Sequence, residues 1–298
     1  MICRVLIYLL TSIILLSCNT KSKLGDLKNK VAAELERNQG DFAVAFKDLT
    51  TGEELLINEH ELFHAASTMK IPVMMEAYKQ AEAGKFSLSD SILIKNEFKS
   101  IVDSSLYSLE VADDSDTVTY KHLGEKTTIS SLIYNMITVS SNLATNILIE
   151  KVDAKKVTKS LRDMGAKDIK VLRGVEDNKA FQAGLSNEVT AYDLMLVFER
   201  LGKGEAVNAK ACEEMINILL DQKYKTIIPA KLPPEVKVAH KTGWIKKLNH
   251  DSGLVILPDG RKYVLILLSA KTEDENAAIE SMAIVSKMIY DYENIKSH

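Results

Sequence analysis

Strand-like segments lie near both ends of the chain, and this placement constrains the fold more than any other feature. Two of them, residues 42–47 and 54–57, flank a Thr-Gly turn. Three more lie towards the C-terminus, at residues 236–242, 252–257 and 263–269, with a Pro-Asp-Gly turn between the last two. Strands joined by such tight turns pair antiparallel. One sheet can therefore form only if the N-terminal pair folds back beside the C-terminal three.

The chain between these ends has the apolar spacing of helices from residue 67 to about residue 220, with loops expected at 113–116 and 178–187. Helices are also predicted near both termini, over residues 24–37 and 273–292. The predicted fold class is therefore α/β (α+β). It has a five-stranded antiparallel sheet built from the N- and C-terminal segments and flanked by helices, with a central all-helical lobe.

This order of elements predicts one domain, residues 24–298, made of two lobes. The sheet lobe takes about residues 24–62 and 225–298, and the helical lobe takes about residues 63–224. A chain of 298 residues that is 46% apolar and 27% charged has ample length for such a core. A net charge of −3 without a long basic run makes nucleic acid an unexpected partner.

The first residues form a separate segment. Arg4 is followed by an apolar run over residues 5–16, which is shorter than the about 20 residues that span a bilayer and is typical of a signal peptide. The run ends in Leu-Leu-Ser-Cys18, which resembles a bacterial lipobox. That resemblance implies a lipoprotein signal peptide at residues 1–17, a lipid on Cys18 and a polar tether at 18–23. The expected location is periplasmic, with the lipid as the anchor to a bacterial membrane; the alternative is an ordinary signal peptide and a soluble periplasmic protein.

Cysteine usage excludes a disulfide within the mature chain. Cleavage would remove Cys3 and modify Cys18, which leaves Cys212 as the one free thiol. Cys212 lies in an apolar helical pattern, so it is expected to be a small core residue.

Ser67 and Lys70 are the first candidates for chemistry. A serine three residues ahead of a lysine on a helix places hydroxyl and amine on one face, about a turn apart. A serine hydroxyl needs a neighbouring base to become a nucleophile. Pro72 is tolerated only near a helix start, so the helix should begin a few residues before it, where free N–H groups favour developing negative charge.

Two further motifs follow in the chain. Ser140-Ser141-Asn142 comes second, with Asn146 shortly after it, and Lys241-Thr242-Gly243 ends a predicted strand. With the first motif they resemble the class A serine β-lactamases and the penicillin-binding serine hydrolases, whose S-x-x-K, S-D-N and K-T-G elements occur in this order. The resemblance covers residues 24–298 and implies the same β-lactamase-like fold, with the active site between the lobes.

The resemblance implies how the serine is acylated. Ser67 attacks the lactam carbonyl, and the backbone N–H groups of Ser67 and Trp244 form the oxyanion hole. Lys70 is the base or proton relay, which requires a lowered pKa, and burial beside Lys241 would provide it. Ser140 passes the proton to the leaving nitrogen. The tryptophan side chain is expected only to pack at the cleft edge.

The other motif residues are implied to bind substrate. Asn142 holds the side-chain amide of the substrate, while Lys241, Thr242 and Gly243 form the site for its carboxylate. The middle residue of the second motif is Ser141 where the family usually has aspartate. That position is mainly structural in the family, so altered support rather than lost chemistry is expected.

Hydrolysis of the acyl-serine needs a group that activates water, and Glu176 is the candidate by resemblance. The family has an asparagine four residues after this glutamate, but Ala180 stands there. Either Asn178 substitutes for it or the loop is built differently. The competing interpretation is that Glu176 is a solvated loop carboxylate.

Histidines and clustered aspartates suggest little chemistry. None of the six histidines has the spacing of a zinc site, and His64 and His240, although near the motifs, are expected to pack or form hydrogen bonds. Residues 113–116 carry three aspartates that could bind a cation, although a solvated loop is the expected state. No cofactor or metal is predicted.

The predicted function is hydrolysis of β-lactam antibiotics through an acyl-serine intermediate. Three alternatives keep the acylation apparatus: a D-Ala-D-Ala peptidase, a small-ester hydrolase, and a penicillin-binding sensor that acylates without turnover. The expected partners are a small β-lactam substrate and, through the lipid only, a membrane. The protein is expected to be a monomer.

Overall fold

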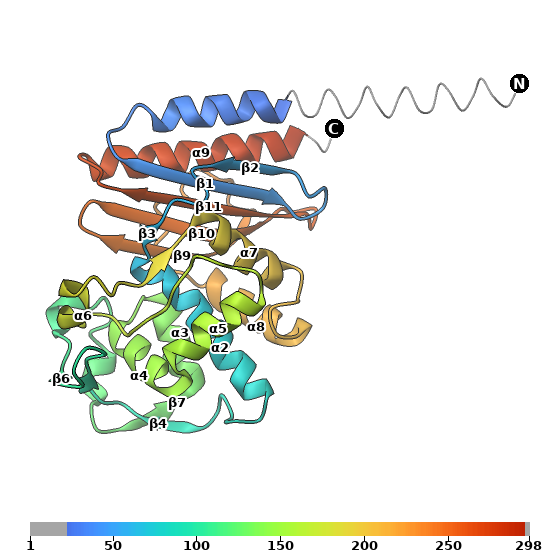
Figure 1. Cartoon of the computed structure of the whole chain (residues 1–298). Coiled ribbons are helices and arrows are strands. Elements are labelled where there is room, and N and C mark those ends of the chain that lie inside the picture. The colour runs from blue at the N-terminus through green and yellow to red at the C-terminus, as the bar shows by residue number, and fades with distance from the viewer. Residues whose placement is uncertain (1–22, 296–298) are drawn as a thin grey trace, which may run out of the picture.

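The computed structural model describes residues 23–295 and has a five-stranded antiparallel sheet at its centre (Figure 1). The strand order is β2-β1-β11-β10-β9. The strands span β1 Asp41–Asp48, β2 Glu54–Ile57, β9 Lys237–Ile245, β10 Leu248–Ile256 and β11 Lys262–Ala270. The predicted fold class is confirmed, because the N-terminal pair joins the C-terminal three through β1 and β11.

The register of β1 against β11 explains why this arrangement is stable. Ala45 pairs with Ile266, and both are fully buried. The central strands are buried along almost their whole length, because helices cover both faces of the sheet. The edge strand β9 is exposed at both of its ends. It contacts the short 3-10 helix η1 (Ala66–Met69), which follows β3 (Phe63–His64).

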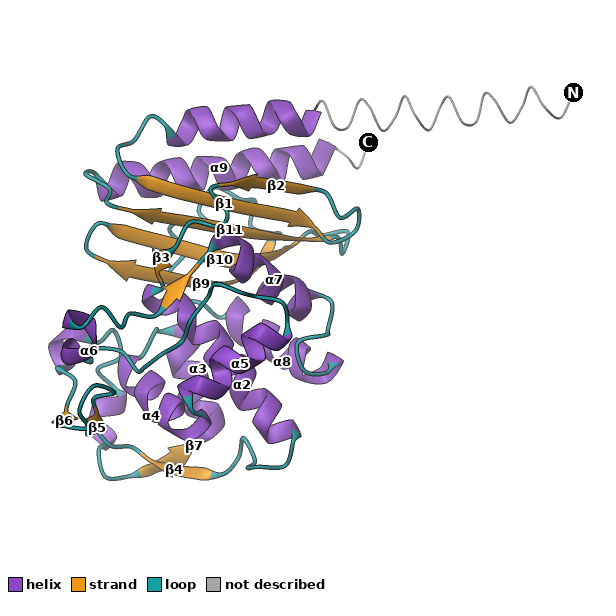
Figure 2. Cartoon of the chain, viewed as in Figure 1, coloured by secondary structure: helices purple, strands orange, loops and turns teal. Residues whose placement is uncertain are grey.

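Two helices from opposite ends of the chain cover one face of the sheet (Figure 2). They are the helix at residues 23–35 and α9 (Glu275–Ile295). Val31 of the first, Phe46 of β1 and Val285 of α9 are fully buried in one apolar cluster. Both helices were predicted, with α9 beginning two residues later and ending three residues later than expected.

The other face of the sheet rests on the helical part of the molecule (Figure 1). Helices α7 (Ala191–Gly202) and α8 (Ala209–Leu220) contact the sheet, and α2 (Lys70–Glu82) lies behind them against α4 (Asn142–Val152). The remaining helices are α3 (Ile129–Thr138), α5 (Ala154–Asp163), α6 (Asn178–Gln182), and the 3-10 helices η2 (Val111–Asp113) and η3 (Thr119–His122). One apolar cluster runs from the sheet into these helices, so the predicted lobe boundaries stay predictions.

Several elements were not predicted. Three pairs of very short strands lie outside the main sheet: β3 with β8 (Glu188–Val189), β4 (Ser91–Leu93) with β7 (Lys126–Thr128), and β5 (Phe98–Lys99) with β6 (Leu106–Tyr107). The loop expected at residues 178–187 was wrong in part, because α6 begins there, capped by Asp177, which accepts the N–H of Ala180.

Two sequence predictions concern cysteine and the membrane. Cys212 is a free thiol buried in the core, as predicted. The predicted signal peptide, the polar tether and lipid site at Cys18 fall almost entirely outside the described residues. Between residues 23 and 295, the structure contains no helix with the length and apolar character needed to cross a membrane.

Candidate active site

Ser67 lies in η1, directly before α2, where a 3-10 turn places residues three apart in line. It is half-buried, and Lys70 is the first residue of α2, with Pro72 two residues later as the sequence predicted. Strand β9 approaches this turn closely. A Cβ on Gly243 would lie 3.2 Å from the Ser67 backbone nitrogen. The Ser67 N–H therefore lies beside the strand residue that precedes Trp244.

Lys70 is the centre of the hydrogen-bond network. Its Nζ donates to the Ser140 carbonyl (2.7 Å), to Asn142 Oδ1 (2.8 Å) and to Ser140 Oγ (3.2 Å). From the other side, Lys241 Nζ donates to Ser140 Oγ (3.0 Å) and to the Thr242 carbonyl (2.9 Å). The Ser140 hydroxyl therefore lies between two lysines, one from the first motif and one from the third.

Burial gives these lysines unusual acidity. Both side chains are fully buried. Burial lowers the pKa of Lys70 to about 7, against the opposing effect of the Asp114 and Glu176 carboxylates. Burial also lowers the pKa of Lys241 well below its ordinary value, and the charge of Lys70 adds to this. Lys70 can therefore be neutral near pH 7, which a base requires.

Glu176 joins the same network through Asn142. The amide Nδ2 of Asn142 donates to Glu176 Oε1 (2.7 Å) while its Oδ1 accepts from Lys70. Burial raises the pKa of the Glu176 carboxyl, and the hydrogen bond from Asn142 opposes the rise. Glu176 is thus a half-buried, hydrogen-bonded group in contact with the motif residues, rather than a solvated loop carboxylate.

Asn146 holds the loop that carries Glu176. Asn146 Oδ1 accepts the N–H of Val175 (2.7 Å), and its Nδ2 donates to the Val175 carbonyl (3.0 Å). Ala180 is fully buried, whereas Asn178 is exposed at the start of α6. The exposed Asn178 forms no contact with Glu176 that would replace the expected asparagine, and the alternative of a differently built loop stays a prediction.

Backbone strain gathers at this site. Ala66, Ser140 and Glu176 have φ values of 43°, 61° and 61°, in the left-handed region that residues with a Cβ rarely occupy. Ala66 precedes the first motif, Ser140 begins the second, and Glu176 is hydrogen-bonded to Asn142 of the second. Such strain persists only where the surrounding contacts fix the backbone, and it is concentrated at functional sites.

Asp114 corrects the interpretation of residues 113–116. Asp114 is buried and accepts the N–H groups of Asn142 (2.9 Å) and Leu143 (2.9 Å), and the hydroxyl of Tyr120 (3.0 Å). Asp116 is buried as well and accepts from Thr119. A solvated loop was therefore the wrong expectation for both carboxylates. Among residues 23–295, no group of three or more His, Cys, Asp or Glu is placed to hold a metal ion.

Sequence reasoning missed Asp114 as a part of the site, although one signal was available. Ser141, where the family usually has aspartate, is fully buried and caps α4 by accepting the N–H of Ala144 (3.2 Å). The serine at that position indicated only that the start of α4 is supported differently.

His64 and His240 have structural partners, as predicted. His240 Nδ1 and Asp251 Oδ1 form a buried pair at 2.8 Å. His240 precedes Lys241 on β9, and alternation along a strand places the two side chains on opposite faces. His64 Nδ1 accepts the N–H of Ala66 (3.1 Å), which supports the turn before Ser67.

Trp244 differs from the expected packing residue. Its side chain is 65% exposed, and its Nε1 donates to Glu275 Oε2 (3.0 Å) at the start of α9. The hydrogen bond fixes the indole above the β9–β10 turn. All three residues of the third motif lie on β9, where Thr242 is half-buried and Lys241 and Gly243 are buried.

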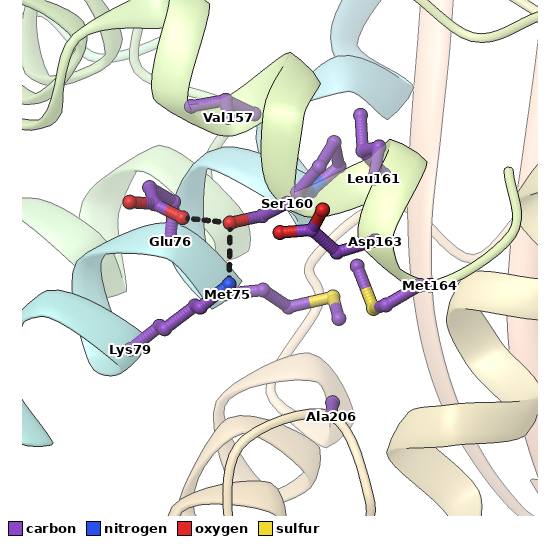
Figure 3. A pocket seen from close by; sticks show the side chains of 10 residues that line it. Met75, Glu76, Lys79, Val157, Ser160, Leu161, Asp163, Met164 and Ala206 are labelled. Atoms are coloured by element: carbon purple, nitrogen blue, oxygen red, sulfur yellow. Dashed lines mark hydrogen bonds between the residues drawn. The ribbon is translucent and has the colours of Figure 1, made fainter. Parts of the chain in front are cut away.

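A separate cavity of about 80 Å³ lies between α2 and α5 (Figure 3). Ser160 is hydrogen-bonded there to Glu76 (2.6 Å) and accepts from Lys79 (2.8 Å). None of the residues of the three motifs lines it. Its polar groups already bond to one another, so it is a packing defect between helices rather than the catalytic site.

Known proteins resemble this chain over nearly its whole length. A beta-lactamase of Bacteroides uniformis is 26% identical over 287 residues, which are 90% of this chain and 92% of that protein. A beta-lactamase structure from Sphaerobacter thermophilus DSM 20745 has a TM-score of 0.76 and 24% identity, covering 89% of this chain and 96% of its own. A mutant of PBP-A, in an acyl-enzyme complex with penicillin G, has a TM-score of 0.78 and 22% identity over 92% of this chain and 97% of its own.

The model of one protein family, described as "Beta-lactamase enzyme family", matches residues 26–293. The matched region contains all three motifs, the sheet and the helices that surround the network around Lys70. The chain therefore belongs to the beta-lactamase enzyme family.

Proposed function

We propose that this protein hydrolyses β-lactams through a covalent acyl-serine on Ser67. One observation carries the proposal: the fully buried Lys70, with its lowered pKa, is bonded to Ser140 and, through Asn142, to Glu176. In the proposed reaction Lys70, three residues after Ser67, is the base, Ser140 is the proton donor for the leaving group, and Glu176 is the carboxylate for the second step.

Acylation uses the neutral form of Lys70. Lys70 Nζ takes the proton of the Ser67 hydroxyl as Oγ attacks the lactam carbonyl, and the backbone N–H groups of Ser67 and Trp244 stabilise the negative charge on the carbonyl oxygen. When the carbon–nitrogen bond breaks, Ser140 gives its proton to the nitrogen and receives one from Lys70, which becomes neutral again. Lys241 and Thr242 bind the substrate carboxylate.

Deacylation uses Glu176. Its carboxylate takes a proton from a water molecule whose oxygen attacks the ester carbonyl, and the carbon–oxygen bond to Ser67 breaks. The proton then passes from Glu176 to Ser67 Oγ, which leaves as the neutral hydroxyl. The carboxylic acid of the opened product leaves, and both catalytic groups regain their initial state.

Turnover of the chromogenic β-lactam nitrocefin, followed by intact-protein mass spectrometry, tests the function. The wild type should turn over nitrocefin, and Ser67→Ala should neither turn over nor form a covalent adduct with a fluorescent penicillin. Ser89→Ala, which changes an exposed serine far from the motifs in sequence, is the matched control and should behave as the wild type.

Each other outcome has a definite meaning. A persistent adduct without turnover would assign the protein as a penicillin-binding sensor. Neither adduct nor turnover would direct the search to D-Ala-D-Ala peptides or small esters, as the uncommon loop around Ala180 allows. Labelling that survives Ser67→Ala would contradict the assignment of the nucleophile.

We further propose that the protein acts in the periplasm as a monomer, anchored by a lipid on Cys18. The support is the apolar run at residues 5–16, which is followed by Ser17 and this cysteine in the lipobox-like sequence. The wild type should partition into detergent, and Cys18→Ala should abolish incorporation of a labelled fatty acid. A wild-type protein that stays in the aqueous phase, with its N-terminus at another residue, would favour an ordinary signal peptide.

A further inference from the structure

Asp114 reaches the catalytic network from a separate segment of the chain. Its carboxylate is 6% exposed, between η2 and η3, and each oxygen accepts the N–H of Asn142 (3.0 and 2.9 Å). The N–H of Leu143 and the hydroxyl of Tyr120 complete its bonds on one oxygen, and the N–H of Asp116 (3.0 Å) does so on the other. A buried charge with this many donors is fully compensated.

The start of α4 already has an ordinary cap. Ser141 accepts the N–H of Ala144, the bond that a capping serine usually makes. Asp114 therefore adds a charge where a neutral cap is already present. The two N–H groups that it takes belong to Asn142 and Leu143, so its effect falls on the backbone of the residue whose side chain joins Lys70 to Glu176.

We propose that Asp114 is a positioning residue of the active site. Its carboxylate fixes the first turn of α4 so that the Asn142 amide bridges Lys70 and Glu176, and it supplies from another segment the charge that Ser141 does not. The proposal rests on the proposed function for its kinetic readout.

The charges around Asp114 give the proposal a signature in pH dependence. Lys70 of α2 and Glu176 of its loop face the α4 start, with Lys241 of β9 behind Lys70; Asp113 and Asp116 flank Asp114 in sequence. Tyr120 of η3 donates to it, and burial and this carboxylate raise the pKa of the Tyr120 hydroxyl well above its ordinary value.

The sign of the change follows from these neighbours. The negative charge of Asp114 raises the pKa of both Lys70 and Glu176. Removing that charge lowers both pKa values, so both groups lose their protons at lower pH. The acid limb of the rate should therefore move to lower pH, whereas a purely structural loss would reduce the rate without moving the limb.

The decisive variant is Asp114→Asn, which keeps the size of the side chain and removes its charge. We expect kcat/KM for nitrocefin to fall by about tenfold, as for loss of a charged hydrogen-bond acceptor, with the acid limb at lower pH. Asp113→Asn is the control. It removes a charge from the exposed neighbour, and its rate should stay within about twofold of the wild type.

A double variant tests whether a carboxylate at position 141 can replace the carboxylate of Asp114. Ser141→Asp combined with Asp114→Asn returns a carboxylate to the same helix start, and it should restore most of the rate and the original acid limb. If Asp114→Asn does not fold, the double variant alone decides. A folded, active double variant supports the proposal, and one that is inactive or unfolded overturns it.

A phenylboronic acid, which bonds to the catalytic serine without lactam chemistry, separates this proposal from the proposed function. Lack of nitrocefin turnover in the wild type would contradict the function alone. The pH dependence of boronate binding would still be compared between the wild type, Asp114→Asn and the double variant. An unchanged rate, or an unchanged limb in both assays, would overturn the role of Asp114.

Discussion

Asn142 shows at the scale of a single residue how the site is connected. Its amide oxygen accepts from Lys70 and its amide nitrogen donates to Glu176, so one side chain positions both the proposed base of acylation and the proposed base of deacylation. An aspartate there would have no donor for Glu176 and a serine would be too short. Besides the substrate binding that the resemblance implies, Asn142 therefore positions Lys70 and Glu176 in the free protein.

Glu176→Gln tests the deacylation step. The amide cannot accept a proton from water, so acylation should persist while hydrolysis of the adduct slows by about 10²–10⁴-fold, the usual contribution of general-base catalysis. Mass spectrometry after mixing with penicillin should show an accumulated acyl-enzyme. Glu213→Gln, at an exposed glutamate of α8, is the control and should show none. Equal turnover and no trapped adduct in Glu176→Gln would leave water activation to another group, such as Lys70.

The sequence identified the motif residues but not the residues that hold them in place. The spacing between Ser67 and Lys70 is local, so it is visible in the sequence, and the structure bonds Lys70 to Ser140 one turn after Ser67. Asp114 reaches Asn142 across 28 positions, a separation at which no periodicity or propensity applies. The support of the second motif could therefore be expected to differ, but its source could not be identified.

At the scale of helices and strands, long elements were predicted from the sequence and very short ones were missed. The strands of the main sheet and α9 were predicted because their apolar patterns extend over many residues. Strands such as β5 and β6 have two residues each, too few for a period to be detected. The turn between them is bonded to the Glu176 loop through one side chain, since Ser100 Oγ and the N–H of Ile101 both donate to the carboxylate of Asp177 (2.9 Å each).

Gly174→Ala tests the fit of the Glu176 loop against α4. A Cβ at this position would overlap Asn146 Oδ1 and lie 2.8 Å from its Cγ, so Asn146 and the loop must separate. Since Asn146 holds Val175, Glu176 should shift, and release of product should slow more than acylation does. Steady-state turnover together with the amount of trapped adduct measures this.

The control for that substitution is Gly25→Ala in the helix at residues 23–35. A Cβ there meets nothing within 4 Å, and alanine favours a helix. This variant should turn over as the wild type and be slightly more stable. If Gly174→Ala shows wild-type turnover and no adduct, the loop does not need close contact with Asn146 for deacylation.

At the scale of the whole molecule, both ends of the chain are needed to place the nucleophile. The N-terminal strands enter the sheet through β11, and the edge strand β9 meets η1 beside Ser67. His250 of β10 adds a direct link, because its Nε2 donates to the carbonyl of His64 (3.0 Å), just ahead of η1. The sheet thus fixes the segment that leads to Ser67, and this link was not visible in the sequence.

His250 should also make the stability of the molecule depend on pH. Burial lowers its pKa to about 4 from the ordinary value of 6.5. The unfolded chain therefore binds a proton between pH 6.5 and 4 that the folded protein does not, so stability is complete above about pH 6.5 and falls as the pH drops towards 4. From pH 6.5 to 5 this one group should cost about 2 kcal/mol of unfolding free energy.

Urea unfolding at pH 7.5 and pH 5 measures this effect. His250→Gln keeps a donor for the His64 carbonyl and has no titrating group, so it should lose less stability than the wild type over this range. His60→Gln, at an exposed histidine, is the control and should lose as much as the wild type. Equal losses in His250→Gln and the wild type would mean that other groups carry the acid sensitivity. A smaller loss in His250→Gln would assign part of the acid sensitivity to His250, which bonds the sheet to the segment ahead of Ser67.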